Sequence, residues 1–297
     1  MLEKVVEQIL RENPNLVGMD DVIEKEVIHH DILYVLHQKG FLGKLTFMGG
    51  TSLRLCYGGS RLSEDLDFTC GDFFIKQDFK GMAEYLESFL QNKYQINVSV
   101  REPQKPGEGN TSTWKITLEK CSGRPDLPSQ KMHVDICSLP SFEVEHRAVV
   151  NHYNLDSQII GLPIPVQSQR EIMADKMIAF AYRKRRIKPR DVWDIVYLTQ
   201  KGMGQDYDLV SRKLAVRKKN KDEFVGLLKK HTDLIKESKE TKQDFYQELT
   251  RFLPKETLKR TLQQEQFWSY VGNVIEEQCN TIINFFQKKT ETLRFKL

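Results

Sequence analysis

The spacing of apolar residues changes once along this chain, and that change limits the fold more than any other feature. Before Pro163 and Pro165, short apolar runs of strand length alternate with helical stretches. From Arg170 nearly to the end, apolar residues recur at helical spacing and no convincing strand is found. We therefore predict an α/β (α+β) domain over residues 1–165, followed by a helical domain over residues 166–297.

The first domain is expected to hold a mixed β-sheet flanked by helices. Helical spacing runs to Gly40, and a second helix is expected over residues 79–92. Thr51 is expected to open a short helix over residues 52–57. The predicted strands cover residues 45–48, 66–68, 95–100, 114–118 and 132–137, with polar loops over residues 103–111 and 122–130.

Composition excludes some classes of protein. The sequence of 297 residues holds no apolar run long enough for a membrane span, and its first residues suggest an amphipathic helix rather than a signal peptide. Five cysteines without a CxxC pair argue against structural zinc and disulfides, so a cytoplasmic protein without a membrane partner is expected. Basic residues exceed acidic ones from Lys201 onward, which fits either a polyanion-binding surface or a solvated helical one.

The segment Gly49-Gly50-Thr51-Ser52 follows a predicted strand and opens a predicted helix. Glycine lets the backbone approach a ligand closely, and a helix N-terminus offers free N–H groups and the positive end of its dipole. This arrangement suits a phosphate group. The same residues also make an ordinary turn and helix cap.

Asp65 and Asp67 stand two residues apart in an apolar context. Residues i and i+2 of a strand point to the same face, where two carboxylates repel unless a cation neutralises them. Oxygen ligands of this kind suit Mg²⁺, and Mn²⁺ is a possible substitute. The alternative is an exposed strand end with two solvated aspartates.

Asp135 is a lone acid between Val134 and Ile136 on a later predicted strand. An aspartate in such an apolar setting needs a partner. A strand that carried Asp135 beside Asp65 and Asp67 would complete a two-metal site for in-line transfer. An edge strand with its acid facing water is the alternative.

Together these motifs resemble the nucleotidyltransferase superfamily with the polymerase-β-like fold. The stretch FMGGTSLRLCYGGSRLSEDLDF resembles the AbiEii/AbiGii toxin family more closely. Glu171-Ile-Met-Ala-Asp175-Lys176 is similar to the E-x-x-x-D-K helix of that family, and the segment from Lys188 to Asp194 to its K-x-R-D-x-x-D motif. The resemblance covers residues 23–200 and rests on three motifs in the right order.

The resemblance implies a metal-dependent enzyme that transfers a nucleoside monophosphate from a nucleoside triphosphate to a hydroxyl. It assigns metal ligands (Asp65, Asp67, Asp135), further catalytic residues (Lys176, Asp194) and nucleotide contacts (Gly49, Gly50, Thr51, Ser52, Lys176, Arg190). The expected acceptor is an RNA such as tRNA, and the expected role is that of a toxin in a toxin–antitoxin or phage-defence pair, with a cognate antitoxin. A nucleotidyltransferase that modifies a small molecule such as an antibiotic, and a non-catalytic binding module, are the alternatives.

The residues of the later motifs fit these roles in more than one way. Glu171 and Asp175 share one helix face, which suggests a binding role for the neighbouring cation, Lys176. Asp191 could simply cap its helix. Six basic residues between Arg183 and Arg190 could bind RNA or the triphosphate, or form a solvated loop. The histidines, among them His29, His30 and His133, show no ligand spacing and are interpreted as structural.

Overall fold

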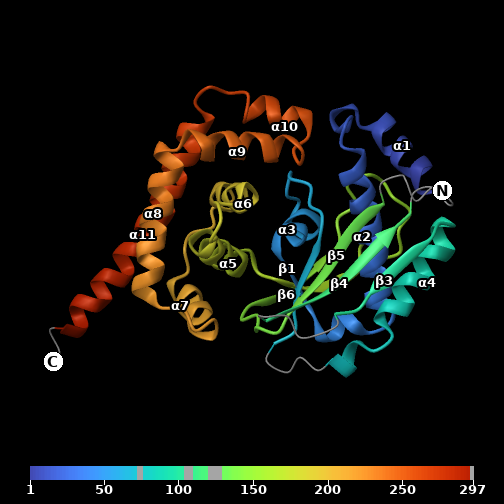
Figure 1. Cartoon of the computed structure of the whole chain (residues 1–297), viewed down its shortest axis with the longest axis horizontal. Helices are drawn as coiled ribbons and strands as arrows, with labels where there is room; N and C mark the ends of the chain where they lie inside the picture. The colour runs from blue at the N-terminus through green and yellow to red at the C-terminus, as the bar shows by residue number, and fades with distance from the viewer. Residues whose placement is uncertain (72–75, 104–109, 120–128, 295–297) are drawn as a thin grey trace. The chain divides into compact units, whose positions relative to one another are not determined.

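The structure in Figure 1 is a computed structural model that describes residues 1–71, 76–103, 110–119 and 129–294. The chain forms two compact units, Met1–Gln167 and Ser168–Leu297. The domain boundary placed after residue 165 stays a prediction, because compactness alone does not establish that either unit folds by itself. The two expected polar loops lie mostly outside the described residues.

The first unit combines helices with one seven-stranded sheet. Its helices are α1 (Leu2–Glu12), α2 (Asp20–Gln38), α3 (Gly49–Tyr57) and α4 (Met82–Tyr94), with short 3₁₀ turns at Pro14–Leu16, Phe41–Lys44 and Lys76–Phe79. Its strands are β1 (Thr46–Met48), β2 (Leu66–Thr69), β3 (Val98–Arg101), β4 (Thr111–Leu118), β5 (Gln130–Cys137), β6 (Val144–Ala148) and β7 (Pro163–Gln167).

The strand order is β3-β4-β5-β2-β1-β7-β6. Strand β2 runs parallel to β5 and antiparallel to β1, while β1 is parallel to β7. The pairs β3–β4, β4–β5 and β6–β7 are antiparallel. The prediction of a mixed sheet flanked by helices is therefore confirmed, and β2 and β5, which carry the predicted acids, are neighbours near its middle.

Two features of the sheet differ from the prediction. Strands β6 and β7 were not expected, because Pro163 and Pro165 suggested a linker. Pro163 is exposed and Pro165 half-buried while Ile164 and Val166 are buried, so the strand keeps its alternation although proline cannot donate to a ladder. Helix α3 begins at Gly49 rather than after Thr51, so β1 runs directly into the helix.

One face of the sheet forms the core of the first unit. Phe47 of β1 and Phe68 of β2 are fully buried and stack with their ring centroids 5.1 Å apart. Trp114 of β4 is buried and meets Phe79 edge-on at 5.9 Å. Because side chains alternate along a strand, the acids next to these core residues emerge on the opposite face.

The second unit is helical throughout its described residues, as the colours from yellow to red show in Figure 1. Its helices are α5 (Gln169–Tyr182), α6 (Pro189–Gln200), α7 (Tyr207–Val216), α8 (Lys221–Glu237), α9 (Lys239–Thr250), α10 (Lys255–Arg260) and α11 (Phe267–Arg294). Helix α8 packs against α5 and α11, and α6 packs against α5 and α9. Among the described helices, none combines the length and the apolar composition that crossing a bilayer requires.

Candidate active site

Two of the three predicted metal ligands lie side by side. Asp67 in β2 pairs in register with Asp135 in β5, and because these strands are parallel the two side chains emerge on the same face. Asp65 directly precedes β2. All three carboxylates are half-buried. Neighbouring strands lie about 4.8 Å apart, so Asp67 and Asp135 hold two like charges at close range.

Gly49 fits against the carboxylate of Asp67. Met48 is the partner of Asp67 on β1, so the chain enters α3 directly beside that acid. The backbone of Gly49 has φ +79°, and a Cβ at this position would lie 2.7 Å from Oδ2 of Asp67. Both the positive φ and the close approach favour glycine. Because residue 49 has no side chain, Asp67 can lie directly against the turn.

Thr51 and Ser52 are buried, and their hydroxyls donate hydrogen bonds to backbone carbonyls. The hydroxyl of Thr51 donates to the carbonyl of Asp65, and that of Ser52 donates to the carbonyl of Gly49 at 2.9 Å. Thr51 therefore fixes the loop before β2 to helix α3 and does not cap the helix. The predicted phosphate contact depends on the backbone N–H groups at the start of α3.

Asp65 has a partner that the sequence did not reveal. The backbone N–H of His133 donates to Oδ1 of Asp65 at 3.0 Å, and Nδ1 of the same imidazole lies 3.2 Å from that oxygen. Asp65 is thus directed toward β5 and not toward Asp67. Only the pairing of β2 with β5 makes this contact, which explains why the spacing of histidines gave no sign of it.

Two residues of α2 hold the segment in front of Asp65. Lys25 forms an ion pair with Glu64 at 2.9 Å, and Nε2 of His29 lies 3.0 Å from the carbonyl of Glu64. Burial lowers the pKa of His29, so its imidazole is held in the neutral form near neutral pH. The prediction of a structural role for His29 agrees with this contact.

Asp135 accepts a hydrogen bond from the hydroxyl of Thr113 at 2.5 Å. Thr113 is also its register partner on β4. A row of neighbouring residues therefore crosses four strands: Thr113, Asp135, Asp67 and Met48. The groups that contact Asp65 and Asp135 are a backbone N–H, a hydroxyl and a histidine, which leaves carboxylate charge available for an added cation.

The donor chemistry of this row suits a hard divalent cation. Asp67 and Asp135 offer carboxylate oxygens side by side, and a side chain at position 49 would come too close to Asp67. As the side chains stand, the described residues contain no group of three His, Cys, Asp or Glu arranged to hold a metal ion. Asp65 contacts His133 and therefore does not converge with the other two carboxylates. The predicted convergence of all three requires the side chain of Asp65 to rotate away from His133.

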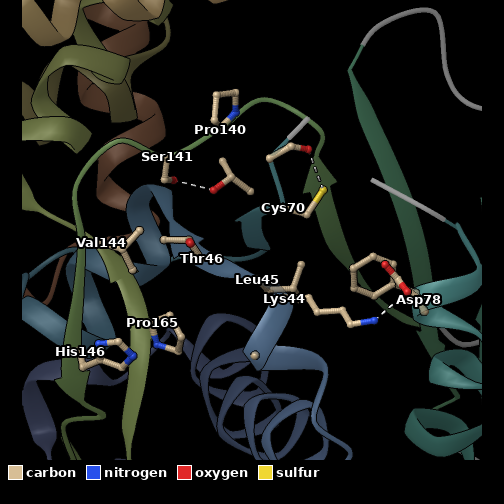
Figure 2. Close-up of a pocket in the computed structure, with 14 residues that line it drawn as sticks. Lys44, Leu45, Thr46, Cys70, Asp78, Pro140, Ser141, Val144, His146 and Pro165 are labelled. Atoms are coloured by element: carbon tan, nitrogen blue, oxygen red, sulfur yellow. Dashed lines mark hydrogen bonds and ion pairs between the residues drawn. The ribbon is translucent and has the colours of Figure 1, made fainter. Parts of the chain in front are cut away.

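The prominent cavity of the first unit lies elsewhere on the sheet. Figure 2 shows it near Thr46, Cys70 and Ser141. Its volume is about 620 Å³. Lys44 and Asp78 form an ion pair of 2.7 Å at one side. None of the three predicted acids lines this cavity.

Lys176 in the second unit is held by two acids. Its Nζ lies 2.9 Å from Oδ1 of Asp191 and 2.8 Å from Oδ2 of Asp194. Arg183 also pairs with Asp191, at 2.9 Å. Burial by itself would raise the pKa of Asp191, but Lys176 and Arg183 outweigh it and hold that pKa below its usual range. Asp191 therefore faces these cations and does not cap α6, whose N-cap is Lys188.

The cation between Glu171 and Asp175 is Lys213, not Lys176. The Nζ of Lys213 lies 2.5 Å from Glu171 and 2.7 Å from Asp175, and its side chain is fully buried. Arg217 adds a second contact to Asp175 at 2.6 Å. The two acids on one helix face thus bind a lysine of α7, which corrects the inference that they point to Lys176.

Several basic residues between Arg183 and Arg190 are neutralised within their own unit. Arg186 pairs with Asp244 and with Glu248, both at 2.9 Å. Arg190 pairs with Glu248 at 3.0 Å and lies over the ring of Phe252. We expect Lys176 and this stretch to border the row of acids. That expectation concerns residues of both units, and it stays a prediction.

Comparison with known families places the chain among the nucleotidyltransferases. The sequence matches the family described as "Nucleotidyl transferase AbiEii toxin, Type IV TA system" over residues 31–273. The chain belongs to this family, and the predicted resemblance is confirmed. None of the curated proteins matches the sequence significantly.

One solved structure shares the fold of this chain, and a second is reported beside it. MenT4, a nucleotidyltransferase toxin from Mycobacterium tuberculosis, is 22% identical with a TM-score of 0.51, over 77% of this chain and 71% of its own. JHP933 from Helicobacter pylori is 16% identical with a TM-score of 0.47, over 92% of this chain and 96% of its own. At these identities the likeness to MenT4 concerns the fold alone.

Proposed function

We propose that the chain transfers a nucleoside monophosphate from a nucleoside triphosphate to a hydroxyl of an RNA such as tRNA. It would act in the cytoplasm as the toxin of a pair with a cognate antitoxin, which is the setting of its family. The observation that carries the proposal is the pairing of Asp67 with Asp135 in register on a half-buried face, with Gly49 against Asp67.

Mg²⁺ or Mn²⁺ would be held by Asp67 and Asp135, with Asp65 as the third ligand. When bound, the metal supplies charge neutralisation and activates the attacking hydroxyl. The backbone N–H groups at the start of α3 would bind phosphate oxygens.

Asp135 is the residue of the chain that would orient the acceptor and take its proton. The acceptor oxygen forms a bond to the α-phosphorus, the bond from that phosphorus to the bridging oxygen breaks, and pyrophosphate leaves with the electron pair. Thr113 donates to Asp135 and thereby fixes its orientation. Asp67 stays a carboxylate and balances positive charge throughout.

In the second unit, Lys176 is the cation that would offset the charge of the triphosphate. Asp191 and Asp194 hold its ammonium group, which would limit the freedom of Lys176 before nucleotide arrives. Glu248 would position Arg190 in the same way for a second nucleotide contact.

A transfer assay tests the proposal. The protein is incubated with total RNA, Mg²⁺ and each of the four α-³²P-labelled nucleoside triphosphates in turn, and the products are separated on a denaturing gel. We expect label on RNA with at least one nucleotide, loss of that label in EDTA, and no label with Asp67→Asn or Asp135→Asn. Label on small molecules but not on RNA, or equal labelling by the variants, would contradict the proposal.

A further inference from the structure

We propose that the open face of strands β3, β4 and β5 binds the single-stranded end of the RNA acceptor and leads its terminal hydroxyl to Asp135. We call this surface the basic face. Its basic residues are Arg101, Lys115, Lys131 and His133, and its hydroxyl residues are Ser99, Thr111, Thr113 and Thr117. The inference rests on the proposed function, which supplies an acceptor with a phosphate backbone.

Alternation along the strands exposes the basic face. In β4, Trp114 and Ile116 are buried while Lys115 between them is exposed. In β5, Lys131 is exposed next to buried Met132. The polar side chains therefore belong to one surface of the sheet, opposite the apolar core.

The register of the basic face places like charges opposite one another. Arg101 of β3 pairs with Lys115 of β4, so two permanent cations lie opposite one another. Lys115 also pairs with His133 of β5, whose imidazole is a cation only when protonated. Lys131 is diagonal to Lys115, opposite Thr117. Like charges directly across a strand pair are destabilising, and a bound anion would relieve the repulsion.

Three basic residues of the basic face have no acidic partner among the described residues, whereas His133 contacts Asp65. Arg101, Lys115 and Lys131 form no ion pair with another described residue. The stretch from Arg183 to Arg190 differs, because Arg183, Arg186 and Arg190 are paired with acids of their own unit. The basic face therefore offers a polyanion positive charge that no described acid neutralises.

The basic face adjoins the acid row. Lys115 follows Thr113 by two residues and His133 precedes Asp135 by two, so each step along a strand is about 7 Å on the same face. An RNA end with its hydroxyl at Asp135 would lay its last phosphates over Lys115 and His133. On this side of the sheet, the row of acids would therefore bind a cation, and the neighbouring basic face would bind an anion.

The chemistry of the basic face favours phosphate contacts over base contacts. It offers cations and hydroxyls, and none of its described side chains is Phe, Tyr or Trp on which a base could stack. Contacts to phosphate fix position without reading sequence. Binding should therefore depend strongly on salt and weakly on base sequence.

The test compares RNA binding by the wild-type chain and the double variant Lys115→Glu/Lys131→Glu. Fluorescence anisotropy follows a labelled single-stranded oligoribonucleotide over a range of salt concentrations. We expect the variant to bind at least tenfold more weakly at low salt. The slope of log K against log salt should fall by about 1.4, since each single-strand phosphate contact contributes roughly 0.7. Thermal shifts caused by nucleoside triphosphate should stay unchanged.

Two other double variants locate the effect. Lys4→Glu/Lys80→Glu makes the same charge change at exposed lysines of the first unit outside the basic face, and its affinity should stay within twofold of wild type. Lys184→Glu/Arg185→Glu changes exposed cations of the second unit. If that variant loses affinity and the basic-face variant does not, the proposal is wrong. Equal binding of a blunt RNA duplex would also overturn it.

The transfer assay separates this proposal from the proposed function. A raised KM for RNA in Lys115→Glu/Lys131→Glu, with KM for the nucleotide unchanged, supports both. An active wild type whose KM for RNA is unaffected by the variant overturns the basic face and leaves the function standing. Weaker RNA binding by the variant, with a wild type that transfers nothing, overturns the function and leaves the basic face standing.

Discussion

The acids of the two units keep different partners. In the first unit, Asp67 faces Asp135, and Asp135 accepts from the hydroxyl of Thr113. In the second unit, Asp191 is paired with both a lysine and an arginine. Acids that already hold a protein cation stabilise a fold, whereas acids placed beside one another gain from a cation that comes from outside. The comparison contrasts an acid that is paired with protein cations, Asp191, with two acids that lie side by side on one face of a sheet.

The largest effect on stability is expected for Lys213→Met. This change leaves Glu171 and Asp175 facing each other in a buried region without the lysine between them. Breaking a buried pair in this way costs about 3–5 kcal/mol of unfolding free energy. Urea unfolding measures it, and Lys229→Met at an exposed position of α8 should change stability by less than about 0.5 kcal/mol. A loss below about 1 kcal/mol would show that the buried acids of the second unit do not depend on their cation.

The second effect concerns Gly49→Ala in the first unit. The positive φ of Gly49 and the closeness of its missing Cβ to Asp67 should make this change cost about 1–3 kcal/mol and reduce transfer activity. Gly43→Ala is a matched control, because Gly43 has no positive φ and nothing within 4 Å of an added Cβ. Urea unfolding of both variants, followed with the transfer assay, gives the comparison. Full activity and stability in Gly49→Ala would mean that Asp67 can move away freely.

The smallest effect is the pH dependence that Asp191 adds to the second unit. The cations around Asp191 hold its folded-state pKa below the unfolded value. A depressed carboxyl pKa contributes stability above the unfolded pKa, near 3.9, and that stability is lost as the pH falls toward the folded pKa. The stability difference between wild type and Asp191→Asn should therefore shrink by more than about 1 kcal/mol between pH 5 and pH 2.

Urea unfolding at several pH values measures this difference. Asp244→Asn, at an exposed acid paired with Arg186, should show a smaller change. A difference between wild type and Asp191→Asn that is constant over this pH range would contradict the assignment.

The sequence predicted those parts of the molecule that local patterns determine. The strands that carry Asp67 and Asp135 follow from short apolar runs, and the Gly49-Gly50 turn follows from composition. Strand β7 was not predicted, because Pro163 and Pro165 suggest a linker. Only the structure shows that these prolines alternate with the buried residues of a strand.

The partners of charged residues could not be predicted, because they depend on pairings across long stretches of chain. Glu171 and Lys213 are far apart in sequence, and nothing local distinguishes Lys213 from the exposed lysines near it. The contact of His133 with Asp65 depends on the pairing of β2 with β5. The same holds for the basic face, since only the register of β3 and β4 places Arg101 opposite Lys115.

The most direct test of the difference between the two units is the binding of Mn²⁺ followed by electron paramagnetic resonance in the presence of a non-hydrolysable nucleoside triphosphate. Free Mn²⁺ should decrease with the wild-type chain and with Asp244→Asn, whose acid already has a protein cation. It should not decrease beyond the nucleotide-only control with Asp67→Asn/Asp135→Asn. Urea unfolding of that variant checks that it is folded. Equal Mn²⁺ binding by Asp67→Asn/Asp135→Asn and the wild-type chain would contradict the account.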